Sequence, residues 1–250
     1  MKKRITISGS LAGLLMFFFL WWLLALFVNR PILPSPLEVV PLFVRGMGGE
    51  LGLHFLASAA RVLAAIFLAT LLAAPLGLVL GQMPKVDRIV GPLIAIIYPI
   101  PKIIFLPVIY VLMGITDMSK ITLIAIIIFF QILVVVRDEA SGLRKELILS
   151  VRSLGAGRRA LFRYVYLPAS LPSVLTALRV SVGTAVAVLF IAEQSLTSYG
   201  LGYYIVVETY QVLLYREMYT GIMAMGLLGM LLYFAIYSIE LRINRHMFLD

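Results

Sequence analysis

Four charged residues interrupt otherwise apolar stretches of the sequence, and they are the first candidates for chemistry: Arg61, Lys102, Arg179 and Glu193. A charge near the centre of a bilayer costs about 2.5–3.5 kcal/mol on insertion scales, so each needs a partner charge, water or a polar ligand. The three cations could contact an anionic solute, whereas the carboxylate could pair with a cation or gate an outer opening. We therefore predict a solute pathway from these four residues together with Tyr98.

Structural explanations of the same residues remain open. Arg61 and Arg179 lie within a turn or two of predicted helix ends, from which long side chains could reach the membrane surface. Lys102 lies deeper, in a proline-rich stretch, and either faces a cavity or is paired within the protein. Glu193 could instead form a structural salt bridge.

The sequence gives little support to catalysis or to metal binding. It contains no cysteine, which excludes thiolate metal sites, disulfides and thiol nucleophiles. His54 and His246 sit near predicted membrane boundaries without clustered carboxylates, so no metal site is expected. An enzyme within the membrane would need converging His, Asp, Ser or Glu side chains, and none is evident. No Gly-x-x-x-x-Gly-Lys-Ser/Thr loop is present, so this chain is not expected to hydrolyse nucleotides or to bind a cofactor.

The elements that position these residues are predicted to be membrane helices. The 250 residues are 62% hydrophobic and 13% charged, a balance too apolar for a water-soluble core. A bilayer crossing needs roughly 20 helical residues. Apolar runs close to that length are Leu11–Val28, Val62–Gly81, Ile89–Thr116, Ile121–Val136, Leu171–Ser195 and Thr220–Ile239. We predict an all-α integral membrane protein, a single transmembrane domain over residues 1–250 with six crossings.

The third run is irregular because it contains four prolines, at positions 92, 99, 101 and 107. Such backbone is tolerated at membrane depth where protein or water satisfies the freed carbonyls. The run is therefore either a broken helix that lines a pathway or a kinked structural helix.

The distribution of lysine and arginine predicts the orientation of the spans. If the N-terminus is cytoplasmic, most basic residues outside the spans are also cytoplasmic, and the exceptions are Arg30, Arg45, Lys120 and Arg216. This positive-inside bias places both termini in the cytoplasm. It also explains the net charge of +9 without nucleic-acid binding. The first run exceeds the 7–15 apolar residues of a secretory signal and lacks a cleavage pattern, so we interpret it as a span.

Residues 137–170 form a polar cytoplasmic segment between the fourth and fifth runs. Apolar residues recur there at helical spacing, at positions 143, 147, 151 and 154. Gly155 can adopt the left-handed conformation that ends a helix, and a second short helix is expected over Ala156–Val165, before Pro168. The result is a helix-turn-helix elbow, apolar on one side and cationic on the other. On physical grounds alone it is either a docking surface or a solvated hairpin on the membrane.

The elbow resembles the EAA loop of ABC importer permeases, whose pattern is Glu-Ala-Ala, three residues, Gly, nine residues, Ile, one residue, Leu-Pro. Gly155, Val165 and Leu167-Pro168 match this pattern. Leu149-Ser150-Val151 replaces the opening triplet, a departure usual in the branch that imports sulfonates, taurine, nitrate and thiamine precursors. Further segments resemble that branch along nearly the whole chain, including Leu33–Pro36, Ser58–Val62, Pro99–Lys102, Ser119–Ile121, Ala177–Val180, Ala192–Glu193 and Gly200–Ile205.

The resemblance implies a type I importer fold with six transmembrane helices that functions as a pair, most simply a homodimer. It implies two cytosolic ATPase subunits that use ATP and Mg, an extracytoplasmic solute-binding protein, and a place in the lipid of the bacterial cytoplasmic (inner) membrane. The ATPase-coupling residues that it implies are Ser150, Val151, Arg152, Leu154, Gly155, Ala156, Leu167 and Pro168.

The expected substrate is a small organic anion such as a sulfonate or taurine. The alternative within the family is a thiamine-precursor pyrimidine or another nitrogen-ring compound. A channel or secondary transporter is the alternative of a different class, and it would leave the elbow unexplained.

Overall fold

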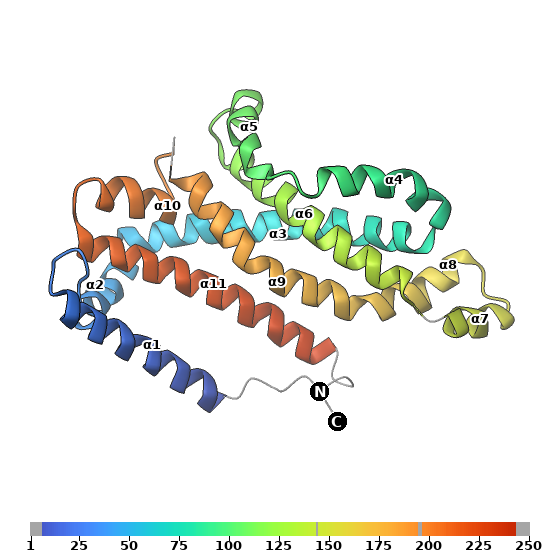
Figure 1. Cartoon of the computed structure of the whole chain (residues 1–250), viewed down its shortest axis with the longest axis horizontal. Helices are drawn as coiled ribbons and strands as arrows, with labels where there is room; N and C mark the ends of the chain where they lie inside the picture. The colour runs from blue at the N-terminus through green and yellow to red at the C-terminus, as the bar shows by residue number, and fades with distance from the viewer. Residues whose placement is uncertain (1–6, 144, 195–196, 244–250) are drawn as a thin grey trace. The chain divides into compact units, whose positions relative to one another are not determined.

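The structure, a computed structural model, describes residues 7–143, 145–194 and 197–243. These residues form helices and turns without any strand among them (Figure 1). Within the described ranges, five continuous helical segments are long and apolar enough to cross a membrane. They are α1 (Ile7–Val28), α3 (Glu50–Gln82), α6 (Asp117–Ser141), the run Arg159–Glu193 that ends in α9 (Leu167–Glu193), and α11 (Tyr215–Ile243).

The third predicted span is a bent pair of helices. α4 (Pro84–Ile97) is followed by the 3₁₀ turn η1 (Lys102–Phe105) and α5 (Leu106–Met113), and the two parts are bent by 81°. Pro99 and Pro101 lie in the break, where neither can donate the amide hydrogen that a continuous helix requires. The prediction of six spans holds when this bent pair counts as one span.

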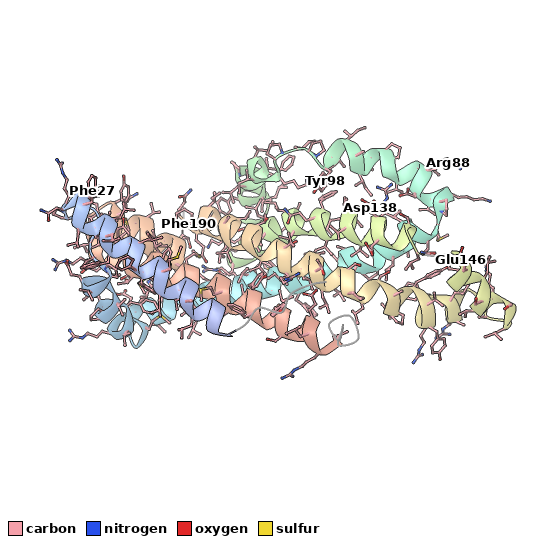
Figure 2. All side chains as sticks on the ribbon, turned by 60° about the horizontal axis from the view of Figure 1, so that its bottom comes forward. Phe27, Arg88, Tyr98, Asp138, Glu146 and Phe190 are labelled. Atoms are coloured by element: carbon pink, nitrogen blue, oxygen red, sulfur yellow. The ribbon has the colours of Figure 1, made fainter. Side chains whose placement is uncertain are left out.

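One compact unit of the chain comprises residues 7–61, 189–194 and 197–231. The indole Nε1–H of Trp21 in α1 donates to the Pro34 carbonyl at 3.1 Å, and its ring stacks on Tyr219 of α11. α2 (Pro36–Met47) contributes the fully buried Val39. The outward residues of α1 are apolar, as Phe27 illustrates with 91% of its surface exposed (Figure 2), which suits contact with lipid.

A second compact unit comprises residues 62–143, 145–188 and 232–243. Close approach of α3 to α6 depends on glycine, because a Cβ at Gly81 would lie 2.7 Å from the Cβ of Ala140. The Gln82 side chain donates to the Ala140 carbonyl at the same contact. Arg137 of α6 holds α4 through a two-pronged ion pair with Asp87, at 2.5 and 2.7 Å.

The chain does not form a separate short helix before Pro168, so that part of the expectation was wrong. α8 (Arg158–Leu161) runs into a π-helical turn, η2 (Phe162–Tyr166), and then directly into α9. The amide of Leu167 donates to the carbonyl of Phe162, five residues back. This wider turn accommodates the proline ring, which would clash with the carbonyl four residues earlier in a regular α-helix.

Candidate functional site

The elbow turns at a glycine with left-handed backbone geometry, as the sequence predicted. α7 (Lys145–Ser153) ends just before Gly155, which has φ of +83° and whose amide donates to the Arg152 carbonyl at 2.9 Å. Residues with a Cβ rarely adopt this conformation, and β-branched residues avoid it most strongly. The direction in which the chain leaves α7 therefore depends on this one glycine.

The elbow exposes apolar side chains at its tip. Leu154 is 85% exposed and Leu149 is 60% exposed, whereas Leu161 and Val165 are buried. α7 lies against α8 and η2, and Glu146 marks its first turn in Figure 2. All eight predicted coupling residues are exposed or half-buried: Ser150, Val151, Arg152, Leu154, Gly155, Ala156, Leu167 and Pro168. The structure thus offers them as a surface without assigning a partner.

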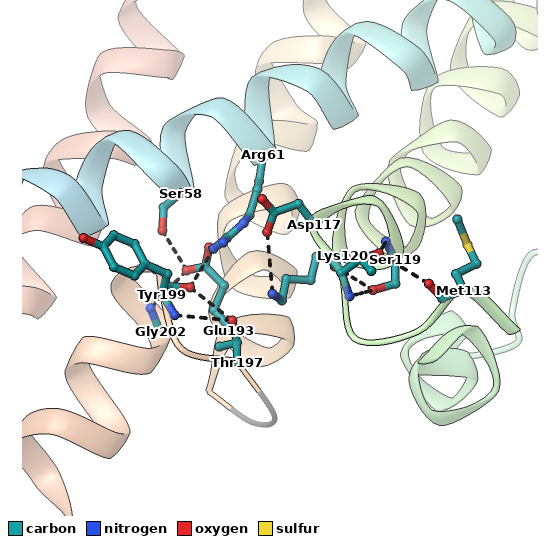
Figure 3. Close-up of polar contacts among 12 residues, drawn as sticks. Ser58, Arg61, Met113, Asp117, Ser119, Lys120, Glu193, Thr197, Tyr199 and Gly202 are labelled. Carbon is teal, nitrogen blue, oxygen red and sulfur yellow. Dashed lines mark hydrogen bonds and ion pairs between the residues drawn. The ribbon is translucent and has the colours of Figure 1, made fainter. Parts of the chain in front are cut away.

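Arg61 and Glu193 form a buried ion pair, which favours the structural alternative for both residues. Arg61 Nη1 lies 2.5 Å from Glu193 Oε1 and donates to the Tyr199 carbonyl at 2.8 Å (Figure 3). The other carboxylate oxygen, Glu193 Oε2, accepts from the Ser58 hydroxyl at 2.7 Å and from the Gly202 amide at 3.1 Å. These contacts fasten the N-terminal part of α3 to the end of α9, to Tyr199 and to α10 (Leu201–Tyr203).

Lys102 closes the break of the third span. Its Nζ donates to the carbonyls of Ile97, Tyr98 and Ile100 at 2.8–3.1 Å, and it lies 4.7 Å from the centre of the Phe130 ring. An ammonium has three donors, so three carbonyls match its capacity. Tyr98 itself is 46% exposed at the end of α4 (Figure 2). This arrangement favours the structural alternative for Lys102.

Arg179 pairs with Glu240, a residue that was not predicted from the sequence. Arg179 Nε lies 3.0 Å from Glu240 Oε2, and Nη1 donates to the Tyr233 hydroxyl at 3.2 Å. The other oxygen of Glu240 accepts from the Thr176 hydroxyl at 3.1 Å. The last predicted span ended at Ile239, one residue before this carboxylate. The signal available in the sequence was a glutamate directly after the apolar run.

His54 has carboxylates around it, so the expectation that it lacks them was wrong. It is 1% exposed, and its Nε2 lies 3.3 Å from Oε2 of Glu208 in the π-helical turn η3 (Tyr204–Tyr210). Burial raises the pKa of Glu208; electrostatic contact with His54 offsets part of the rise, and the Glu50 carboxylate adds to it. Glu50 precedes His54 by one helical turn, a spacing visible in the sequence, whereas Glu208 is far along the chain. His246 lies outside the described residues.

Comparison with known proteins relates the whole chain to transport permeases. It is 30% identical over 253 residues to the taurine transport system permease protein of Escherichia coli, which covers 98% of this chain and 90% of that protein. It is 29% identical over 191 residues to the formylaminopyrimidine transport permease protein of Halalkalibacterium halodurans, covering 76% of each.

The fold matches a chain of the MetNI methionine ABC transporter in an inward-facing conformation, with a TM-score of 0.64 and 22% identity. The match covers 78% of this chain and 96% of that chain. Residues 73–248 match the family described as "Binding-protein-dependent transport system inner membrane component". The chain therefore belongs to this family, and it is a multi-pass ABC transporter permease of the inner membrane.

Proposed function

We propose that this chain forms the solute pathway of an ABC importer and couples it to ATP hydrolysis by separate cytosolic ATPase subunits. The observation that carries the proposal is the elbow, where Gly155 has a left-handed backbone and Leu154 is 85% exposed. An exposed apolar tip beside basic residues such as Arg152 and Arg159 suits burial in a groove of a partner protein. Membership of the permease family supports docking over a hairpin that lies on the membrane.

The partners follow from the same proposal. Two copies of this chain, most simply a homodimer, enclose the pathway, and an extracytoplasmic binding protein delivers the solute. ATP and Mg are used by the ATPase subunits, and this chain binds no nucleotide of its own. Closure of the ATPases moves the elbows, and the attached spans reorient as rigid bodies.

The proposed solute is a small organic anion such as taurine or another sulfonate. The support is the 30% identity to the taurine permease over nearly the whole chain. The basic residues give less support to an anionic solute than the sequence suggested, because Arg61 and Arg179 each pair with a buried carboxylate. The second candidate is a nitrogen-ring compound, supported by the similarity to the formylaminopyrimidine permease.

Reconstituted transport tests the proposal. The permease, its ATPase and its binding protein are placed in liposomes with ATP on the ATPase side, and uptake of labelled taurine and of formylaminopyrimidine is measured. We expect taurine uptake that requires both ATP hydrolysis and the binding protein. Selective uptake of the pyrimidine would support the second candidate. Flux that needs neither ATP nor the binding protein would contradict an importer and indicate a channel or secondary transporter.

A further inference from the structure

Three potential metal ligands converge where α3 begins. Glu50 and His54 are four residues apart on this helix and therefore lie on the same face. Glu208 joins them from η3, and the ligand atoms of the three side chains all lie within 4.8 Å of one another. The two buried arginine–glutamate pairs and the elbow described above make no use of this cluster.

The backbone of Gly200 holds the His54 ring in an orientation that suits metal ligation. His54 Nδ1 lies 3.1 Å from the Gly200 carbonyl oxygen and 3.0 Å from the Gly200 amide nitrogen. If the ring is protonated on Nδ1, Nδ1–H donates to the Gly200 carbonyl. If it is protonated on Nε2, Nδ1 accepts from the Gly200 amide. When Nδ1–H donates to the carbonyl, the lone pair of Nε2 is directed at the carboxylates. Metal-binding histidines commonly donate their second nitrogen to a backbone carbonyl in this way.

The Nε2 atom has no hydrogen bond of its own. It is buried without a hydrogen-bond partner among the described residues, and Glu208 Oε2 lies at ion-pair distance, 3.3 Å. Tyr199 stacks on the imidazole with ring centres 4.6 Å apart, which limits its rotation. A buried and oriented nitrogen that makes no hydrogen bond and lies beside two carboxylates is a feature that a ligand would explain.

The ligand set suits a zinc ion in chemistry, charge and size. Zinc accepts imidazole nitrogen and carboxylate oxygen, and three protein ligands leave a fourth position for water. Two carboxylates and a neutral imidazole carry a charge of about −2, which balances a divalent ion. Tetrahedral ligands roughly 2.0–2.1 Å from zinc lie about 3.3–3.4 Å apart, close to the spacing of His54 and Glu208. Glu50 is exposed, so it can move inward to complete the set and leaves the ion a route of entry.

We propose that Glu50, His54 and Glu208 bind a zinc ion that joins the first turn of α3 to η3. The ion would cross-link two segments that lie more than 150 residues apart in the sequence. Under the orientation predicted from the basic residues, this cross-link lies on the extracytoplasmic side. The proposal is independent of the transported solute and of ATP coupling.

Zinc binding to the purified full-length chain tests this proposal. The protein carries an affinity tag without histidine, is stripped with a chelator, and is titrated with zinc chloride. Bound metal is measured by elemental analysis, and thermal unfolding is followed in parallel, with magnesium chloride as the non-binding control ion. We expect about one zinc ion per chain and a rise in the unfolding temperature that magnesium does not cause.

Three variants locate the ion. E50Q removes an exposed ligand, and H54N removes Nε2 while its amide replaces Nδ1 toward Gly200. E139Q changes an exposed glutamate of α6 as the matched control. We expect zinc affinity to fall about tenfold or more in the first two variants and to stay unchanged in the control. Absence of stoichiometric zinc in the wild type, or equal binding in E50Q and E139Q, would overturn the proposal. If H54N fails to fold, the comparison of zinc affinity between E50Q and E139Q still tests the proposal, because Glu50 is exposed.

Discussion

Arg61 and Glu193 lie 132 positions apart in the sequence, yet their charged groups are 2.5 Å apart and both side chains are buried. Each charge makes the other tolerable, because an isolated charge in an apolar interior is strongly unfavourable. Glu193 also accepts from Ser58 and Gly202, so the carboxylate holds a turn as well as a cation. The pair is therefore a structural joint, and its loss has a measurable cost.

Glu193→Gln should destabilise the permease by about 3–5 kcal/mol, because it leaves the guanidinium of Arg61 buried without its counter-charge. The matched control is Glu38→Gln, which breaks the exposed pair of Glu38 and Arg216 and should cost at most about 1 kcal/mol. Denaturant unfolding of both variants in the same lipid nanodiscs measures the difference. Equal losses of unfolding free energy in the two variants would show that the buried pair stabilises the fold no more than the exposed pair does.

Gly200→Ala should weaken the same joint without changing a charge. Gly200 has φ of +126°, and a Cβ there would lie 2.6 Å from both Arg61 Nη1 and Glu193 Oε1. We expect the strained backbone alone to lower the free energy of unfolding by about 1–3 kcal/mol. Gly226→Ala on α11 is the control, since its Cβ would meet nothing within 4 Å and alanine favours a helix. Thermal unfolding compares the two, and an unchanged unfolding temperature in Gly200→Ala would refute the steric argument.

Lys102→Met should impair folding of the broken span along with transport, because three backbone carbonyls lose their donor. Lys85→Met removes an exposed lysine of α4 and serves as control. The measurement is the yield of assembled complex beside uptake per complex. If Lys102→Met assembled normally and lost uptake selectively, the ammonium would belong to the solute pathway instead.

The spans could be predicted because their signal is local. Runs of apolar residues set the length of a crossing. Five of the six predicted runs correspond to α1, α3, α6, α11 and the segment around α4 and α5, and the run that begins at Leu171 corresponds to α9. The start of α3 was placed at Val62, although the helix begins at Glu50. The first part of α3 was not predicted as part of the span because it contains His54 and Arg61, which hydropathy counts as polar. In the structure, contacts with distant residues bury both side chains.

The site could be predicted only in part, for a related reason. Gly155 was predicted correctly because the end of a helix often requires a left-handed backbone at one position, and a glycine after a helical pattern indicates it. The partners of Arg61, Arg179 and His54 depend on which helices pack together, which a single sequence does not express. Pro168 misled the prediction because a π-helical turn accommodates a proline that would end a regular helix.

The orientation of the chain can be tested with single cysteines, since the natural sequence has none. Val212→Cys should react with a membrane-impermeant thiol reagent from outside the cell, and Ser153→Cys only after the membrane is opened. Val212 and Ser153 are both exposed. Thr209, on the same outer segment as Val212, is unsuitable for labelling because it is 2% exposed and its hydroxyl donates to two carbonyls. Outside labelling of Ser153→Cys would invert the topology and separate the elbow from any cytosolic ATPase.

The central claim is that the elbow transmits ATP-driven motion, and Gly155→Val in the assembled transporter tests it most directly. Valine at φ of +83° strains the turn by about 1–3 kcal/mol, a small cost that is concentrated in the docking element. Gly157→Val is the matched control because no neighbour lies within 4 Å and its backbone is not left-handed, and Gly155→Asn should retain function since asparagine tolerates that geometry.

The decisive quantity is solute taken up per ATP hydrolysed, measured with the amount of copurified ATPase in preparations of equal permease abundance. We expect Gly155→Val to lose ATPase binding or to hydrolyse ATP without uptake, while Gly157→Val and Gly155→Asn stay near wild type. Wild-type coupling in a correctly inserted Gly155→Val permease would contradict this expectation.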